Sequence, residues 1–127
     1  MNLLIADDSE IIRTNLKKLL NHSLHDTMID ESSTVQLTID KLGASKIDVM
    51  VLDIQLPDGS GFDVLDYLNL QPFKPVTIIF TNFPDEVNHA KSIQKGADYF
   101  LDKSDEYETL LELLSKLETI KPRREKK

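Results

Sequence analysis

Short apolar runs alternate with amphipathic stretches along the whole chain. Five of these runs have the length and composition of strands, and residues 47–52 (IDVMVL) and 76–80 (VTIIF) are the most apolar. Nearly continuous apolar runs are typical of strands that helices cover on both faces. The other candidate strands are residues 3–6, 27–32 and 99–101, of which the second has the weakest pattern.

The stretches between the runs carry apolar side chains at helical spacing, and capping or turn residues bound them. Ser9 can cap the first helix, and Gly43 can stop the second. Ser60 and Asp63 form a capping-box pattern for a third helix that runs to about Leu70. Two further helices are expected, one over residues 84–96 and one with an apolar stripe at Tyr107, Leu110, Leu111, Leu114 and Leu117.

Strand and helix alternate five times, which implies right-handed βαβ units around a parallel sheet. We therefore expect an α/β fold of the (βα)5 type, with a doubly wound, five-stranded parallel sheet and helices on both faces. Residues 1–120 would form this domain, and residues 121–127 (KPRREKK) a basic tail. In such folds the functional site forms at the carboxyl ends of the strands.

The composition excludes several classes of protein. The chain has 15 basic and 22 acidic residues and a net charge of −7, which argues against nucleic acid or an anionic membrane as its partner. It has no cysteine for disulfides or metal thiolates. No apolar run approaches the roughly 18 residues of a membrane helix, so a cytoplasmic protein is expected. The basic tail is either a disordered, solubilising end or a docking segment.

Polar residues follow four of the five predicted strands. They are Asp7 and Asp8 after the first strand, Asp53 after the third, Thr81 after the fourth and Lys103 after the fifth. Three carboxylates at one edge repel one another, and Mg²⁺ is a hard cation that accepts such ligands together with a phosphate oxygen. A metal, an ammonium and a hydroxyl around one carboxylate predict phosphoryl transfer to that carboxylate. Each residue alone is common at a strand end, so only the combination carries this interpretation.

With these residues in place, the sequence resembles the receiver domains of two-component response regulators over about residues 2–118. The stretch VMVLDIQLPDGSGFDVL resembles the phosphorylation-site segment of that family. The start LIADDSE, the pair TN after VTIIF, and GADYFLDK before the last helix complete the pattern. The resemblance implies a flavodoxin/CheY-like fold with the strand order 2-1-3-4-5.

The resemblance also implies a role for each matching residue at the predicted phosphorylation site. Asp53 would be the phospho-acceptor and a Mg²⁺ ligand. Asp8 would bind Mg²⁺ directly, Asp7 would bind it through water, and the backbone carbonyl of Gln55 would be a further ligand.

Three more residues would sense the phosphoryl group. Lys103 would pair with it, and Thr81 would donate a hydrogen bond to it. Phe100 would be the switch aromatic that moves inward, the alternative being an ordinary core residue. The donor would be a histidine kinase or a histidine phosphotransfer protein. The face made by the fourth helix, fifth strand and fifth helix would then bind a downstream protein, so the chain is expected to be a stand-alone signalling receiver rather than an enzyme.

The sequence departs from the family pattern in the loops beside the site. Ser104 stands where many receivers have proline, so a trans bond is expected before it, and Ser104 or Asp105 could cap the last helix. Asn82 stands where a small residue is usual. Phe83 and Gln55 lie where the family sets its dephosphorylation rate, and a bulky Phe83 predicts slow loss of phosphate.

Two other classes of protein stay open at this point. A phosphatase of the haloacid dehalogenase type also uses an aspartate nucleophile and Mg²⁺, but its second acid would fall at Gln55. A pseudo-receiver that binds partners without phosphorylation would not need the acidic residues, the threonine and the lysine. The three histidines, His22, His25 and His89, are expected to be surface or helix residues rather than ligands.

Overall fold

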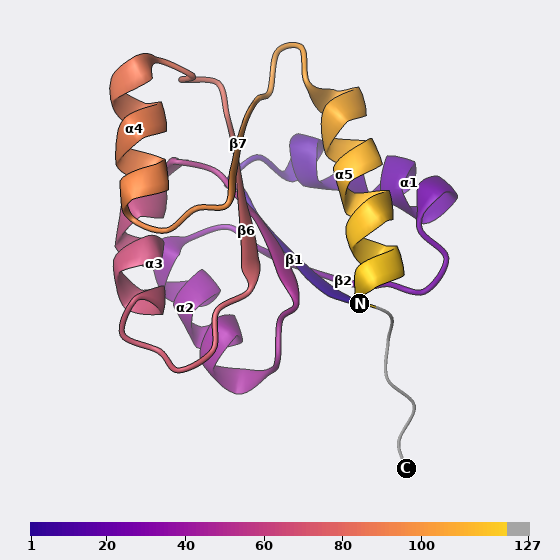
Figure 1. Ribbon diagram of the computed structural model, residues 1–127, viewed down its shortest axis with the longest axis horizontal. Helices are drawn as coiled ribbons and strands as arrows, with labels where there is room; N and C mark the ends of the chain where they lie inside the picture. Colours follow the sequence, from indigo (N-terminus) through magenta and orange to yellow (C-terminus); the bar gives the residue numbers. More distant parts are fainter. Residues whose placement is uncertain (122–127) are drawn as a thin grey trace.

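The computed structural model describes residues 1–121, and its main feature is a parallel sheet in the order β2-β1-β3-β6-β7 (Figure 1). The strands are β1 (Asn2–Ala6), β2 (Met28–Ser32), β3 (Val49–Leu52), β6 (Val76–Thr81) and β7 (Tyr99–Asp102). All four pairings in this sheet are parallel. The predicted fold class is therefore confirmed, since β6 and β7 are the fourth and fifth strands of the sheet in chain order.

In the described part of the chain, five helices cover the two faces of the sheet (Figure 1). They are α1 (Glu10–Ser23), α2 (Val35–Ala44), α3 (Gly61–Leu68), α4 (Glu86–Gln94) and α5 (Tyr107–Ile120). Figure 1 shows α1 and α5 on one face and α2, α3 and α4 on the other. Both faces are therefore covered, which explains why the central strands are apolar throughout.

Alternate side chains of the central strands supply two separate cores. Ile5 and Val51 pack with α1 and α5, whereas Leu4 and Met50 pack with α2 and α3. All four side chains are almost completely buried. The period of two along each strand thus holds helices on both faces, and the polar residues that follow the strands are left at the edge of the sheet.

A short hairpin between β3 and α3 is absent from the prediction, which has only a turn there. It pairs β4 (Gln55–Leu56) with β5 (Gly59–Ser60) in antiparallel fashion. Strands of two residues are too short to show a hydrophobic period. At the turn, the Asp58 carboxylate accepts hydrogen bonds from the backbone N–H groups of Val35 and Gln36, at 2.7 and 3.0 Å. The loop after β3 therefore caps the first turn of α2.

Several helix ends differ from the predicted ones by one or two residues. The helix expected over residues 84–96 is α4 at Glu86–Gln94, with Asp85 as its N-cap. The helix α2 continues through Gly43 to Ala44, and the N–H of Ser45 still donates to the carbonyl of Lys41. The helix α3 ends at Leu68 instead of about Leu70, because the chain tightens there into bonds that span three residues.

The predicted cap of α5 is wrong. The N-cap residue is Glu106, and it makes no side-chain capping bond. Ser104 is not available for capping, because its N–H and its hydroxyl both donate to Asp102 Oδ1, at 2.9 and 2.8 Å. No peptide bond within residues 1–121 is cis, so the expected trans bond before Ser104 is confirmed. The predicted tail, apart from Lys121, lies outside the described residues.

Candidate functional site

The polar residues at the carboxyl ends of the strands form one cluster. Lys103, directly after β7, extends between two carboxylates, with its Nζ 2.5 Å from Asp7 Oδ2 and 2.8 Å from Asp53 Oδ2. All three side chains are at least nine-tenths buried. The sheet thus joins residues 7, 53 and 103 into a single buried ion triad, as the strand-end argument predicts.

Asp53 is held from several sides. Its N–H donates to the carbonyl of Ala6 at 2.9 Å, and its Oδ1 accepts from the N–H of Ile54 at 2.7 Å. Gly61, the first residue of α3, passes so close that a Cβ there would lie 2.5 Å from the carbonyl oxygen of Asp53. The absence of a side chain at Gly61 lets α3 begin directly against the loop that carries Asp53.

Asp7 and Asp8 occupy the turn between β1 and α1. The N–H of Asp7 donates to the carbonyl of Ser32, and its Oδ1 accepts from the N–H of Ser9. Ser9 in turn caps α1 by accepting from the N–H of Ile12, as predicted. The buried Asp7 is therefore fixed in place, whereas Asp8 in the same turn is exposed to solvent.

Arg13 stabilises this turn through a hydrogen bond to its backbone, although the sequence pattern does not single Arg13 out. Its guanidinium donates to the carbonyl oxygen of Asp7 at 2.6 Å and to Glu31 Oε1 at 2.9 Å. Lys17 donates to the other oxygen of Glu31, at 2.7 Å. The predicted cap at Ser9 places Arg13 one helical turn into α1. Its partner Glu31 in β2 can be identified only once the pairing of β1 with β2 is known.

The electrostatics of the triad follow from two carboxylates sharing one ammonium. Burial raises the pKa of Asp53 above its usual range, with a smaller contribution from Asp7, and Lys103 only partly opposes this. Burial alone would lower the pKa of Lys103, but the two carboxylates together hold it above its usual range. The triad as a whole carries an excess negative charge in a buried place.

This excess charge fits a divalent cation. Asp7, Asp8 and Asp53 each offer a carboxylate oxygen, and these atoms lie within 4.8 Å of one another. Asp8 and Gln55 line the same cavity of about 530 Å³ beside Asp53. An all-oxygen donor set with open volume beside it suits Mg²⁺, which keeps waters and accepts phosphate oxygens.

Thr81 ends β6 at the same edge and is fully buried. Its Oγ accepts a hydrogen bond from the N–H of Phe83 at 3.1 Å, which leaves the hydroxyl proton free to be donated elsewhere. Phe83 is about half exposed and lines the cavity next to Asp8. Asn88 in α4 donates to the carbonyl of Phe83, so this loop is tied to the helix that follows it.

Phe100 in β7 is half-buried against the core on the α2 and α3 side. The ring of His89 stacks on it, with centroids 4.6 Å apart. Sequence reasoning treats His89 only as a surface or helix residue and misses this contact. Its side chain is exposed on α4, and no pattern in the sequence shows that α4 lies beside β7.

Comparison with known proteins identifies the family. The model of the response regulator receiver domain matches residues 3–115, and the chain belongs to this family. Receivers of this family accept phosphoryl groups and bind Mg²⁺ at an acidic pocket. The family predicted from the motifs is thus confirmed.

Curated relatives and solved structures agree with this assignment. The nitrate/nitrite response regulator protein NarL of Escherichia coli (strain K12) is 28% identical over 112 residues, which are 88% of this chain and 52% of that protein. The sensory transduction protein LytT of Bacillus cereus is 29% identical over 116 residues, which are 91% of this chain and 46% of that protein. The chain therefore spans about half the length of these curated relatives.

Among solved structures, a CheY-like receiver domain protein from Methanospirillum hungatei JF-1 is similar to this chain. It has a TM-score of 0.79 and 26% identity, and the match covers 91% of both chains. The beryllofluoride-activated NtrC4 receiver domain has a TM-score of 0.79 and 28% identity, over 91% of this chain and 93% of that one.

Within residues 1–121, no helix is long and apolar enough to cross a membrane.

Proposed function

We propose that this chain accepts a phosphoryl group on Asp53 from a phosphohistidine of a histidine kinase or a histidine phosphotransfer protein. The observation that carries the proposal is the buried triad, in which the Lys103 ammonium lies against Asp53 with the acidic pair beside it. In the reaction, an Asp53 oxygen attacks the phosphorus in line with the imidazole nitrogen. The new bond is O–P, the P–N bond breaks, and its electron pair stays on the imidazole.

Several side chains have separate roles in this step. Asp8, Asp7, Asp53 and the carbonyl of Gln55 would hold Mg²⁺, which when bound offsets the negative charge of the phosphoryl oxygens. Lys103 already lies at Asp53 and supplies a further positive charge at the incoming oxygens. The fixed backbone bonds of Asp53 keep its carboxylate oriented for attack.

The phosphorylated state would be transmitted through Thr81 and Phe100. An aspartyl phosphate offers more acceptor oxygens than the free carboxylate, so it can take a hydrogen bond from the Thr81 hydroxyl. Movement of Thr81 would draw the loop after β6 inward and leave room for Phe100. Phosphorylation would thus shift a population between two packings that already exist.

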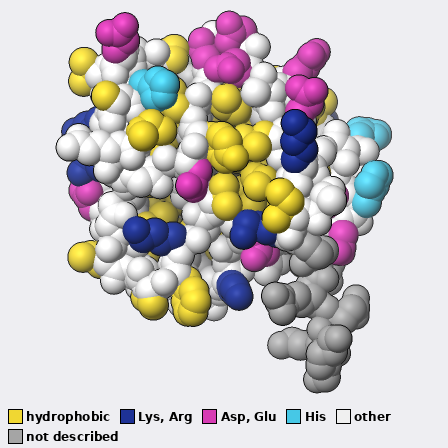
Figure 2. All heavy atoms as spheres, in the orientation of Figure 1, with side chains coloured by type: hydrophobic (Ala, Val, Ile, Leu, Met, Phe, Trp, Pro, Cys, Tyr) yellow, Lys and Arg dark blue, Asp and Glu magenta, His cyan; other side chains and the backbone are white. Residues whose placement is uncertain are grey.

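The surface that changes would be the face of α4, β7 and α5. Figure 2 shows hydrophobic side chains near the middle of this face of the molecule, between α4 and α5. Ile93 in α4 and Tyr99 in β7 are partly exposed hydrophobic residues of these elements, at 45% and 41%. Docking of a protein target on this face is the output that we propose. The expectations of a cytoplasmic location and of a stand-alone receiver stay predictions.

The test is to incubate the protein with Mg²⁺ and a small acyl phosphate or amidophosphate, and to measure its intact mass. A single phosphate adduct that is absent from Asp53→Asn supports the proposal. Asp66→Asn, which removes an exposed aspartate on α3, should still form the adduct. Continuous turnover of phosphate esters would favour the phosphatase, and no adduct would favour the pseudo-receiver.

A further inference from the structure

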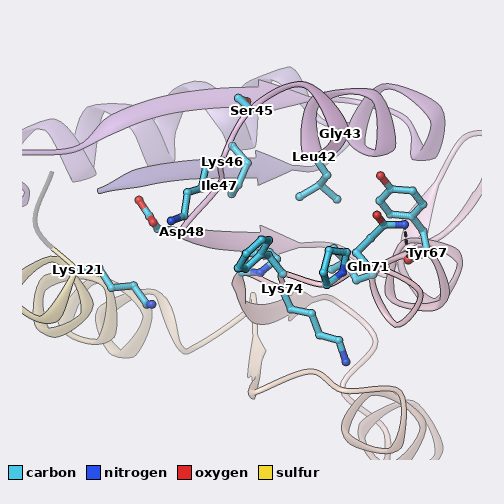
Figure 3. Close-up of a pocket in the computed structure, with 14 residues that line it drawn as sticks. Leu42, Gly43, Ser45, Lys46, Ile47, Asp48, Tyr67, Gln71, Lys74 and Lys121 are labelled. Atoms are coloured by element: carbon cyan, nitrogen blue, oxygen red, sulfur yellow. Dashed lines mark hydrogen bonds between the residues drawn. The ribbon is translucent and has the colours of Figure 1, made fainter. Parts of the chain in front are cut away.

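A second cavity lies at the end of the sheet opposite to Asp53. Its volume is about 580 Å³, and Figure 3 shows its lining side chains. Its walls come from the loops that lead into β3 and β6, at residues 45–48 and 71–75, and Lys121 at the end of α5 lines it as well. None of the residues proposed for phosphorylation borders this cavity.

The cavity combines apolar surface with an exposed aromatic ring. Leu42, Leu68 and Pro75 contribute apolar side chains, and Tyr67 is half-buried beside them. Phe73 lines the same cavity with 79% of its surface exposed, which is the largest exposure of any aromatic residue among residues 1–121. A phenyl ring kept in water on a loop has an open face on which a flat ring can stack.

The charge of the cavity is opposite to that of the whole chain. Lys46, Lys74 and Lys121 line it, and in residues 1–121 none of them forms an ion pair with a carboxylate. The ammonium of Lys46 lies 6.0 Å from the centre of the Phe73 ring, and that of Lys74 donates to the Asn69 side chain. Figure 3 shows these lysines coming from three separate segments of the chain.

The single carboxylate that lines the cavity, that of Asp48, can offset only one of these three positive charges. Asp48 accepts a hydrogen bond from the N–H of Asn2 at 2.7 Å and is used within the fold. The lining therefore carries three lysines for one carboxylate, with the ammonium of Lys74 turned to Asn69, on a chain whose net charge is −7. Such a local excess of positive charge attracts anions, which the rest of this acidic surface repels.

We propose that this cavity binds a small anionic ligand with a flat ring, of the mononucleotide class. The ring would stack on Phe73 over the apolar wall, and the phosphate would meet the ammonium groups of Lys46 and Lys121. The hydroxyl of Tyr67 and the amide of Gln71, which lie side by side across the cavity from Lys121 in Figure 3, would contact the edge of the ring. The volume is within the range of small-molecule sites, about 300–1,000 Å³.

A small ligand fits this place better than an acidic peptide. A peptide would need the lysines but not a walled cavity with an apolar side, and its extended backbone would use an exposed strand edge or groove. Here the ammonium groups, the ring and the apolar wall surround one volume. These groups would be used together only by a ligand that carries charge and ring in one compact molecule.

The experiment is a titration of the ¹⁵N-labelled full chain with adenosine monophosphate, followed by amide chemical shifts. We expect saturable shifts at Gly43, Tyr67 and Phe73, and much smaller ones at Asp53. Adenosine and inorganic phosphate, each added alone, should bind at least about tenfold more weakly, because each lacks one of the two recognised parts.

Variants separate this site from general attraction of anions. Phe73→Ala and Lys46→Gln should each weaken binding by about five- to tenfold. Lys91→Gln is the matched control. The ammonium of Lys91, in α4, also lies over an aromatic ring, that of Phe62 at 4.5 Å, but Lys91 does not line this cavity. It should leave the affinity unchanged.

Three results would overturn the proposal. They are the absence of saturable shifts at the cavity, equal binding of phosphate alone, and tighter binding of an acidic peptide than of the nucleotide at these amides. Phosphorylation of Asp53, measured by mass on the same variants, should be unaffected. A failure of nucleotide binding thus leaves the proposed phospho-acceptor role untouched, and the reverse also holds.

Discussion

The imidazole of His89 in α4 lies flat against the ring of Phe100 in β7, with ring centroids 4.6 Å apart and ring planes 8° apart. This stack joins the helix after the Thr81 loop to the residue expected to switch. If phosphorylation requires Phe100 to leave this position, the stack stabilises the unphosphorylated packing. Aromatic stacks of this kind contribute about 0.5–1.5 kcal/mol.

We therefore expect His89→Ala to shift the protein towards its activated packing. Under the proposed switch, binding at Asp53 favours the activated packing, so the affinity for beryllofluoride with Mg²⁺ should rise by about two- to tenfold. The matched control is Val87→Ala, which shortens an exposed side chain on the same helix. Unchanged or weaker beryllofluoride binding in His89→Ala would contradict a role of the stack in the switch.

The raised pKa of Asp53 makes stability depend on pH and on metal. The folded chain binds the proton of the Asp53 carboxyl more tightly than the unfolded chain does. The free energy of unfolding should therefore fall as the pH rises from 3.8, the ordinary pKa of an aspartate, through the raised pKa of Asp53 in the folded chain. Each pKa unit corresponds to about 1.4 kcal/mol. Asp53→Asn should flatten this dependence in metal-free buffer, as measured by urea unfolding at several pH values.

Millimolar Mg²⁺ should restore stability on the high-pH side of that window, where Asp53 is charged. The gain should approach about 2.7 kcal/mol when the ion is at a hundred times its dissociation constant. Asp8→Asn should lose most of this gain, whereas Asp40→Asn, on α2, should keep it. A Mg²⁺ effect of equal size at a pH below the carboxylate range would argue against these ligands.

Arg13 is expected to act as a positioning residue for the acidic turn, because it donates to the carbonyl of Asp7. Arg13→Gln should raise the dissociation constant for Mg²⁺ by about three- to tenfold. The control is Lys17→Gln, which removes the same charge from the same partner, Glu31, without touching Asp7. If charge alone mattered, both variants would bind Mg²⁺ more tightly, and that result would remove the positioning role.

Phe83 lies beside the expected phosphoryl position and is held by Thr81 and Asn88 through its backbone. Its ring should shield the acyl phosphate from water. Phe83→Ala should therefore speed the loss of phosphate from Asp53 by about threefold or more, measured by intact mass in Mg²⁺ buffer. Phe73→Ala removes an exposed ring at the far end of the sheet and should leave the rate unchanged, and no acceleration in Phe83→Ala would end the hypothesis.

The close approach of Gly61 to Asp53 predicts a large effect of one methyl group. A Cβ 2.5 Å from the carbonyl of Asp53 must displace backbone, so Gly61→Ala should lower the free energy of unfolding by about 2 kcal/mol or more. Gly43→Ala is the control in α2, where the nearest atom to a Cβ is 3.5 Å away. That variant should be neutral or more stable by up to about 1 kcal/mol, because alanine favours the helix.

The apolar period of the chain was enough to predict the five strands, the parallel sheet and the edge at which Asp7, Asp53 and Lys103 meet. These features depend on local composition and on the chirality of βαβ units, and both can be inferred from the order of residues along the chain. The helix caps at Ser9 and Ser60 were predictable for the same reason, since each involves neighbours two or three residues apart.

Tertiary structure alone decided the contacts between segments that are far apart in sequence. The bond from Arg13 to Asp7 with its support from Glu31, and the stack of His89 on Phe100, join elements whose relative placement no local pattern encodes. The lysine-lined cavity behind the sheet likewise forms only where two loops and the end of α5 come together. Packing sets these distances, and packing depends on every side chain of the two cores at once.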